Sequence, residues 1–452
     1  MWQLPQLDPE NWLKSNPDAT SATIAICDIN GVFRGKRVPV EQIVKIFKDG
    51  VRMPTSSCTV DIWGCDLEDS ELVFDSGDAD AICTVTDRGL VERHIAGQIS
   101  AFVPITMFNE DGTPEPTDPR QALAAIVDRF KSHGYRPVVA TELEFYLTSG
   151  PAEEVEPATL PGEAGPLEHH NVLSVAELDQ LQPFLDDIYA EATRQGIVPD
   201  AIISESGTAQ FELNLMHSDD ALRAADDAVL FKNLVRSVAR AHGFRATFMA
   251  KPFGDKAGNG LHVHFSVLDA AGHNIFDNGT DDGSDLMLHA VAGLAAMMTD
   301  SALIFAPHQN SYRRIRPNAH APTAVAWGYE NRTCAIRIPG GANAARRIEH
   351  RVAGGDANPY LVLTAILGAA IYGIENKLTP PAPTEGNAYE TDAPLLPLHW
   401  HGAIDAFEKS TLLPHIIDPQ LIRLFAQIKT QELDKLLSIV PASEYSAYLE
   451  TV

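Results

Sequence analysis

The stretch Val138-Val139-Ala140-Thr141-Glu142-Leu143-Glu144-Phe145-Tyr146-Leu147 is apolar and β-branched apart from two glutamates. This composition predicts a β-strand. Because successive side chains of a strand point to opposite faces, Glu142 and Glu144 share one face, while Leu143 and Phe145 share the other. Two carboxylates on one face of an interior strand repel each other, and loss of water increases the cost. A bound divalent cation removes that repulsion; the simpler alternative for an isolated pair is a solvated strand face.

Three later stretches carry further candidate ligands. They are 205–214 with Glu205 and Glu212, 258–266 with His262, His264 and Ser266, and 347–351 with Glu349 between Arg347 and Arg351. Glu205 and Glu212 have an odd offset, which places them on opposite faces of a straight strand, so we expect Gly207 to make a turn that lets them converge. His262, His264 and Ser266 alternate along one strand face beside a glycine-rich loop.

The residue types in these stretches indicate the chemistry. Carboxylate oxygens with an imidazole suit Mg²⁺ or Mn²⁺ better than zinc. Arginine is the residue for bidentate contacts to phosphate or carboxylate, and arginines cluster at 313–316, 332–337 and 346–351. Each cluster alone is compatible with a surface salt-bridge patch. Together with the carboxylates they favour phosphoryl transfer from a metal-bound nucleotide.

Composition limits the possible partners. The chain has 452 residues, 45% hydrophobic content and a formal net charge of -27. This charge argues against nucleic acid and anionic membranes as partners and is compatible with cationic small molecules. No stretch approaches the ~20 apolar residues of a membrane span. The five cysteines form no CxxC pair, which disfavours a disulfide scaffold or zinc ribbon, and the first residues lack a signal-peptide pattern. We therefore expect a cytoplasmic protein.

Two domains are expected from the length and from a change in composition. Residues 1–108 predict a small β-rich domain with a hairpin at Asn30-Gly31 and a basic turn at 34–37. A larger domain follows over 109–452, and its first helix begins at Asp118-Pro119. Further helical patterns occur at 175–195, 218–242, 284–300 and 357–376, and amphipathic helices end the chain.

These motifs, in this order, resemble the type I glutamine synthetase family over nearly the whole chain. The resemblance rests on Glu142-Leu143-Glu144, 205–212, 258–264, Asn310-Ser311-Tyr312-Arg313-Arg314, 331–339 and Arg347-Ile348-Glu349. Segments 28–40, 247–252 and 351–360 are similar to the gamma-glutamylputrescine synthetase subfamily. The resemblance implies an α+β fold with an N-terminal β-grasp-like domain and a catalytic domain built on a curved antiparallel sheet with flanking helices. It also implies two stacked hexameric rings, a homo-oligomeric dodecamer with active sites shared between subunits.

The resemblance implies a role for each candidate residue. Glu144, Glu205 and Glu212 hold one metal ion, and Glu142, His262 and Glu349 hold the other. L-glutamate lies against Gly258, with Arg314 and Arg351 on its carboxylates. Arg332 meets the transferred phosphoryl group, Arg337 and Arg347 meet the nucleotide phosphates, and His264 and Ser266 contact ATP. No role follows for Asn259, which lies between Gly258 and Gly260.

Two departures from the family pattern concern the acceptor. Ammonia-using members carry an Asp where this chain has Pro54, and a flap Glu where it has His320. Without those carboxylates an ammonium ion loses its main electrostatic attraction, so a primary amine such as putrescine becomes the expected acceptor. His320 is then a candidate general base or acceptor-pocket residue, or alternatively a packing residue at a subunit contact. Asp61 or Glu330 is a candidate partner for the far ammonium of a diamine.

The expected reaction is ATP-dependent formation of a gamma-glutamyl amide through a gamma-glutamyl phosphate. Two other enzymes remain as alternatives: an ammonia-dependent glutamine synthetase, and a ligase for a small monoamine such as methylamine or ethanolamine. A structural or regulatory relative that has lost catalysis is a third reading. Such proteins lose metal ligands, and all six candidates are present in this sequence.

Overall fold

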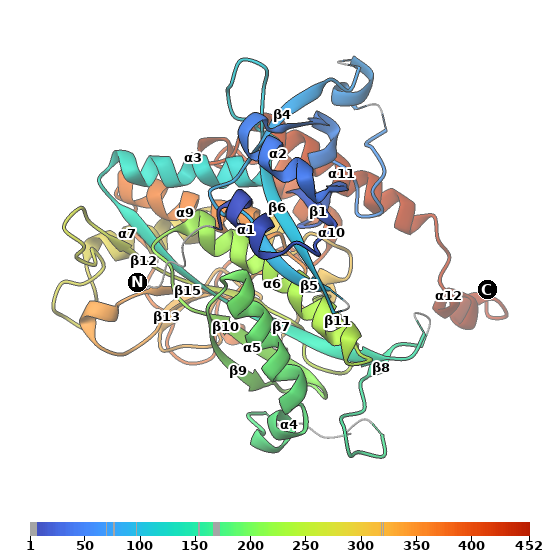
Figure 1. The fold of residues 1–452 in the computed structure, drawn as a ribbon. Coiled ribbons are helices and arrows are strands. Elements are labelled where there is room, and N and C mark those ends of the chain that lie inside the picture. Colours follow the sequence, from blue (N-terminus) through green and yellow to red (C-terminus); the bar gives the residue numbers. More distant parts are fainter. Residues whose placement is uncertain are drawn as a thin grey trace.

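The computed structural model describes residues 7–68, 70–75, 77–95, 97–151, 154–165, 172–317, 319 and 321–452. Over these residues the chain forms two β-sheets with helices packed around them (Figure 1). The smaller sheet is built from the first quarter of the chain and the larger sheet from the middle. The predicted mixed α+β fold is therefore confirmed. Division of the chain at 108 and 109 remains a prediction.

The smaller sheet has the strand order β2-β1-β6-β4-β3, with β5 paired to β6. Its strands are β1 Ser21–Cys27, β2 Phe33–Pro39, β3 Val51–Pro54, β4 Asp80–Val85, β5 Val91–Ile95 and β6 Gln98–Phe108. Two short helices, α1 Pro9–Ser15 and α2 Ile43–Asp49, accompany these strands. The β1 and β6 strands are parallel, and the other pairs are antiparallel.

The hairpin predicted at Asn30-Gly31 is confirmed, because β1 and β2 pair from Cys27 opposite Phe33 outward. The basic turn expected at 34–37 is wrong, since these residues lie within β2. The chain has already reversed at Gly31, whose φ is +73°. Gly35 is required there for close approach: a Cβ on it would lie 2.0 Å from the carbonyl oxygen of Ile24.

The larger sheet has the order β13-β14-β15-β12-β7-β10-β9, and β8 and β11 also pair with β7. Its strands are β7 Arg136–Ser149, β8 Glu156–Pro157, β9 Pro199–Ser204, β10 Gln210–Leu215, β11 Arg245–Thr247, β12 Leu261–Leu268, β13 Trp327–Tyr329, β14 Ile336–Ile338 and β15 Ile348–His350. Only the β13–β14 pair among these described strands is parallel. The long strand β7 is central to the sheet.

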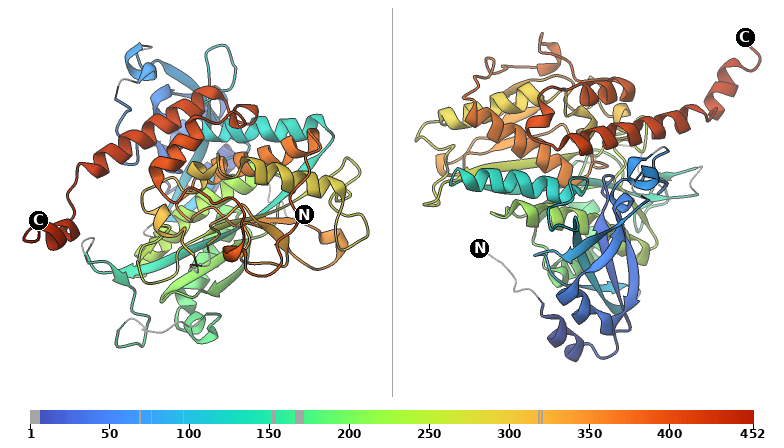
Figure 2. Two further views of the ribbon diagram at one scale, coloured as in Figure 1. Left: turned by 180° about the vertical axis from the view of Figure 1, so that it is seen from behind. Right: turned by 90° about the horizontal axis from the view of Figure 1, so that it is seen from above.

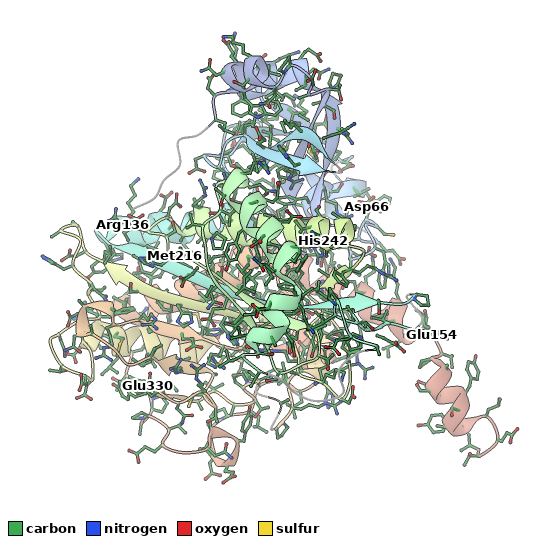
Figure 3. All side chains as sticks on the ribbon, turned by 60° about the horizontal axis from the view of Figure 1, so that its bottom comes forward. Asp66, Arg136, Glu154, Met216, His242 and Glu330 are labelled. Atoms are coloured by element: carbon green, nitrogen blue, oxygen red, sulfur yellow. The ribbon has the colours of Figure 1, made fainter. Side chains whose placement is uncertain are left out.

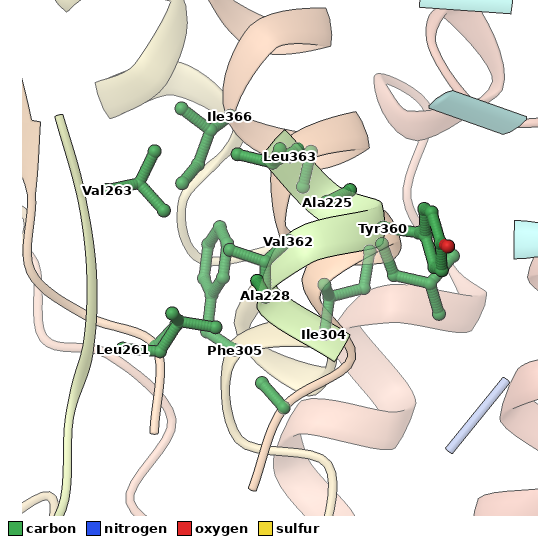
Figure 4. Close-up of a cluster of buried hydrophobic side chains, with 14 of the residues drawn as sticks. Ala225, Ala228, Leu261, Val263, Ile304, Phe305, Tyr360, Val362, Leu363 and Ile366 are labelled. Carbon is green, nitrogen blue, oxygen red and sulfur yellow. The ribbon is translucent and has the colours of Figure 1, made fainter. Parts of the chain in front are cut away.

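The helices that follow the small sheet in the chain are α3 Pro119–Ser132, α4 Val175–Gln180, α5 Gln182–Gln195, α6 Ala221–Ala241, α7 Asp285–Met297, α8 Ala302–Phe305, α9 Pro359–Glu375, α10 Trp400–Glu408, α11 Pro419–Leu437 and α12 Ala442–Tyr448. Helices α3 and α6 pack on one face of the large sheet against β7, and α9 packs on both of them. Figure 4 shows how α6, α8 and α9 meet Leu261 and Val263 of β12 in one buried apolar cluster. The predicted start of α3 is confirmed, because the Asp118 side chain accepts a hydrogen bond from Arg120 N.

The N-terminal part docks onto α11 and the start of α9. Lys429 donates a hydrogen bond to Asn30, the Asn358 side chain donates to the carbonyl of Asp28, and Lys435 pairs with buried Asp61 at 2.6 Å. The views in Figure 2 place the small sheet beside the large one, with α12 extending away from both. Within the described residues, no helix is both long enough and apolar enough to cross a bilayer.

Candidate active site

The two glutamates of β7 lie on the face of the large sheet opposite the helices. Leu143 and Phe145 are fully buried on the other face, as the alternation predicts. The neighbouring strand β10 pairs in register with β7, so that Glu212 lies opposite Glu144. Figure 3 labels Arg136, the first residue of β7, and Met216, which directly follows β10.

The turn between β9 and β10 carries Glu205. Glu205 N donates to Gln210 O and Gln210 N donates to Gly207 O, which closes a tight hairpin. A Cβ on Gly207 would lie 1.8 Å from the hydroxyl of Tyr146, so only glycine fits at this point. The predicted turn at Gly207 is confirmed, and it brings Glu205 and Glu212 to the same side of the sheet.

Both histidines of β12 contact Glu142. His262 lies opposite Glu142 in the strand register, and its Nδ1 is 3.2 Å from Glu142 Oε2. His264 Nε2 is 2.9 Å from Glu142 Oε1, and His264 itself lies opposite Glu349 of β15. The imidazoles therefore connect the carboxylates of β7 with the one on β15.

Possible ligand atoms form three overlapping groups, each lying within 4.8 Å of one another: Glu144, Glu205 and Glu212; Glu142, Glu212 and His262; and Glu142, His264 and Glu349. The first group has the predicted composition. The second predicted set, Glu142, His262 and Glu349, is divided between the other two groups. His264, which the resemblance places against ATP, lies among the ligand atoms here.

Burial and mutual repulsion act on these carboxyls. Burial, together with the charges of Glu142 and Glu144, raises the pKa of Glu205 to about 7 and that of Glu212 to about 9. Burial alone would also raise the pKa of Glu142, but hydrogen bonds to His262 and His264 outweigh it and hold that pKa well below its usual range. A divalent cation neutralises this repulsion, and the oxygen-rich donor set fits Mg²⁺ or Mn²⁺.

Three arginines adjoin the carboxylates, of which Arg314 and Arg351 are buried and Arg337 is partly buried. Arg351 and Arg337 both pair with Glu349, the latter at 2.7 Å. The Arg314 side chain donates to the carbonyl oxygens of Val352 and Arg351, and no described carboxylate forms an ion pair with it. Burial lowers the pKa of Arg314, which means that its charge is poorly compensated. Such a guanidinium is suited to an anionic ligand.

The match to a family model decides the family. The model of the glutamine synthetase catalytic domain matches residues 116–448. The chain belongs to the glutamine synthetase family. The recognition made from the motifs is confirmed, and so is the conclusion that the protein is a ligase forming a carbon–nitrogen bond.

Several relatives in this family are named for amine substrates. The gamma-glutamylputrescine synthetase of Escherichia coli is 34% identical over 96% of this chain and 93% of its own. The glutamate–isopropylamine ligase of a Pseudomonas species is 32% identical over 94% of both chains. The gamma-glutamylethanolamide synthetase of Streptomyces coelicolor is 36% identical over 72% of this chain and 70% of its own.

Solved structures confirm the predicted glutamine-synthetase-like fold. The GmaS/ADP complex superposes with a TM-score of 0.84 at 27% identity and covers 98% of this chain and 99% of that one. A novel glutamine synthase homologue superposes with a TM-score of 0.80 over 97% of both chains at 23% identity, which supports the fold alone.

The remaining predicted residues line two separate cavities. Ser266 and Arg347 line a cavity of about 1210 Å³ together with Glu142 and His264. Arg332 is exposed and lines a separate cavity of about 570 Å³ with Glu330. The structure thus does not bring Arg332 onto the carboxylates. His320 lies outside the described residues, and its role stays a prediction.

The structure also shows the surroundings of Gly258 and of the two candidate partners of a diamine, Asp61 and Glu330. The main chain of Gly258 lies against Arg314, whose Cγ would be 2.8 Å from a Cβ at this glycine. The Asp61 carboxylate is already satisfied by Lys435 and by the backbone N–H groups of Trp63 and Cys65. It is therefore unsuited to a diamine, whereas Glu330 is 60% exposed and pairs with Arg337.

Tyr146 has a role in the site that the sequence motifs did not indicate. Its hydroxyl donates to the carbonyl of Ala257 at 2.8 Å, which attaches the end of β7 to the loop before Gly258. The signal was present, because Tyr146 has the same parity as Glu142 and Glu144 and therefore lies on their face of the strand.

Proposed function

We propose that the protein uses ATP to join the gamma-carboxylate of L-glutamate to a primary amine. The observation that carries this proposal is the convergence of seven possible ligand side chains from four distant segments beside the buried Arg314. Neutral packing does not explain five glutamates gathered in one site. A two-cation phosphoryl-transfer site explains both the glutamates and the adjoining arginines.

In the proposed reaction an oxygen of the glutamate gamma-carboxylate attacks the terminal phosphorus of ATP. The bond from this phosphorus to the β–γ bridging oxygen breaks, and ADP leaves with that oxygen. The amine nitrogen then attacks the acyl carbon and expels phosphate. When bound at these ligands, Mg²⁺ or Mn²⁺ would supply positive charge that offsets the charge of the phosphoryl oxygens. Arg314 and Arg351 orient the glutamate carboxylates, and Ser266, Arg337 and Arg347 bind the nucleotide.

Deprotonation of the amine needs a base. His320 is the candidate in the acceptor pocket, since an imidazole accepts a proton near neutral pH. Arg332 is proposed to approach the phosphoryl group from the loop between β13 and β14, which carries it at the rim of its cavity. Both assignments rest on the match of their motifs to the family.

A primary amine is preferred over ammonia for two reasons. The chain lacks the two carboxylates with which ammonia-using members hold ammonium, having Pro54 and His320 at those places. Three relatives are named for putrescine, isopropylamine and ethanolamine as the joined amines. Putrescine is our first choice, which places the enzyme in polyamine breakdown, and a small monoamine is the second.

An acceptor panel tests the proposal. Purified protein with ATP, Mg²⁺ and glutamate should release phosphate with putrescine or another primary amine, and mass spectrometry should show the corresponding gamma-glutamyl amide. EDTA should abolish the activity and excess Mg²⁺ or Mn²⁺ should restore it. Ammonium as the best acceptor would overturn the amine proposal. Absence of glutamate-dependent turnover with every acceptor would overturn the ligase proposal.

We also propose a cytoplasmic dodecamer of two stacked hexamers. All five cysteines are unpaired thiols, which fits a reducing compartment. The C-terminal segment leaves Leu437, Ile439 and Leu449 exposed by 59% to 72%, an apolar surface that a second subunit would cover. Light scattering of the purified protein measures the subunit number, and a monomer would contradict this assembly.

A further inference from the structure

The side chain of Gln210 joins two segments of the site. It is 1% exposed and lies on β10 between Glu205 and Glu212, on the same face as Glu212. Its Oε1 accepts a hydrogen bond from Gly207 N at 2.9 Å. Its Nε2 donates to Gly258 O and to Asn259 Oδ1, both at 3.0 Å. One amide therefore links the turn that carries Glu205 to the loop that carries Gly258.

The partners fix the orientation of this amide. The backbone N–H of Gly207 is only a donor, so it must face the oxygen of Gln210, and the carbonyl of Gly258 is only an acceptor, so it must face the nitrogen. The same logic orients Asn259, whose Nδ2 donates to Met249 O at 2.8 Å and more weakly to Thr247 O at 3.3 Å. Glutamate at 210 would lose the donor and place a carboxylate against two oxygens.

Asn259 extends the connection into the rest of the loop. It is fully buried, its backbone N–H donates to Ala250 O at 2.9 Å, and its carbonyl accepts from Gly355 N at 3.0 Å. Gln210 and Asn259 thus connect four chain segments: the 205–209 turn, the 247–250 stretch, the glycine loop and the segment after Arg351. Both side-chain amides are uncharged, and the oxygen and nitrogen of each have hydrogen-bond partners. A fully hydrogen-bonded buried network of this kind favours one rigid arrangement.

We propose that Gln210 is a positioning residue that holds the loop at 258–260 and the turn at 205–209 as one unit. The roles of these two segments rest on the proposed function. Because the Gly258 carbonyl is held by Gln210 on one side while Arg314 packs against this glycine, loss of the amide frees the loop to move away from Arg314. The expected consequence is a selective loss of glutamate binding, since the residues proposed to bind ATP lie on β12, β14 and the segment before β15.

The decisive variant is Gln210→Met, which keeps the length and removes the hydrogen bonds. Loss of two hydrogen bonds to the loop predicts a rise in the KM for glutamate of about tenfold, with the KM for ATP changed by less than about twofold. Gln210→Glu should behave in the same way. The matched control is Gln195→Met, which removes another buried amide, one that contacts Glu191 on α5, and should leave both KM values unchanged.

A measurement independent of turnover accompanies the kinetics. In Gln210→Met, hydrogen exchange of the amides at 249–260 should become faster than in the wild type, while the amides of α9 stay protected. In the double variant with Asn259→Ala, the increase in glutamate KM should be smaller than the product of the two single increases, because both changes break one link.

The outcomes separate the two proposals. An active wild type whose Gln210→Met variant keeps the normal glutamate KM, or loses glutamate and ATP affinity equally, refutes the positioning role and leaves the ligase function intact. A wild type that turns over no glutamate refutes the function instead. A Gln210→Met protein that fails to fold is replaced in the assay by Gln210→Glu, for which unchanged exchange at 249–260 again refutes the positioning role.

Discussion

Replacing Glu205 by glutamine should stabilise the metal-free protein, which is the reverse of the usual effect of changing a partly buried, hydrogen-bonded residue. Burial and the neighbouring carboxylates raise the pKa of Glu205 from 4.5 to about 7. One pH unit corresponds to about 1.4 kcal/mol, so this rise amounts to about 3 kcal/mol of cost to the folded state. Because the side chain keeps some contact with water, we expect about half, or about 1.5 kcal/mol.

The sign of this effect depends on pH. Below pH 4.5 the carboxyl is protonated in both the folded and the unfolded chain, so it adds no cost. As the pH rises toward 7 the unfolded chain releases the proton while the folded chain retains it, and the cost grows. Above pH 7 the cost is constant. The advantage of Glu205→Gln should therefore be small at pH 5 and full at pH 8.

Thermal unfolding in EDTA measures this effect. At pH 8 the variant should melt higher than the wild type by on the order of 2 °C. With Mn²⁺ added, the wild type should gain more than the variant, because it keeps all the carboxylate ligands. The matched control is Glu115→Gln, since Glu115 is also buried, accepts hydrogen bonds from Thr117 and lies outside the cluster. It should give no gain in EDTA and a normal response to Mn²⁺.

The reasoning fails if Glu205→Gln melts below the wild type in EDTA at pH 8 and still shows the full response to Mn²⁺. That result would mean that the carboxylates neither repel one another nor meet at a cation. A gain of equal size at pH 5 and pH 8 would also contradict the argument, since it would show an effect of packing and not of ionisation.

Three further substitutions test other parts of the molecule. Arg314→Met should raise the KM for glutamate by about 100-fold and that for ATP by less than about threefold, and equal effects in steady-state kinetics would contradict its assignment. Arg347→Gln should raise the KM for ATP by about tenfold with little change for glutamate; unchanged nucleotide affinity in calorimetry would exclude it from the site. Asp61→Asn should lower the free energy of unfolding by about 1–2 kcal/mol at pH 7. Burial raises the pKa of Asp61, but hydrogen bonds from Lys435 and Cys65 N outweigh burial and lower the pKa overall. The stabilisation by the Asp61 carboxylate is therefore present above the usual carboxyl pKa and is lost in acid. Equal melting temperatures of variant and wild type at pH 7 would refute this prediction.

Sequence alone predicted those features that follow from local periodicity. The alternation around Glu142 and Glu144 placed both on one face, and the cap at Asp118 placed the start of α3. The same local rules failed at 34–37, where a basic, glycine-containing segment resembles a turn but forms a strand. Its conformation is decided by pairing with β1, and strand pairing is not contained in local propensity.

The parts of the site that the sequence did not predict depend on contacts between distant segments. Nothing near Gln210 in the sequence indicates that its amide reaches Asn259, because that contact requires β10 and the glycine loop to meet across β7. The regrouping of His264 with Glu142 and Glu349 likewise follows from the register of β12 between β7 and β15. Motif resemblance named these side chains but not their spatial neighbours.

The repelling glutamates stay together because the same strands carry apolar residues on their other face. Leu143 and Phe145 of β7 and Leu261 and Val263 of β12 are each at most 1% exposed and pack in the core that α6 and α9 complete. Each such side chain contributes about 2 kcal/mol by leaving water, so four contribute about 8 kcal/mol. This is of the same order as the cost implied by the raised pKa values of Glu205 and Glu212 together. The apolar face therefore offsets much of the repulsion on the charged face, and it holds the carboxylates in place for cations that relieve the rest.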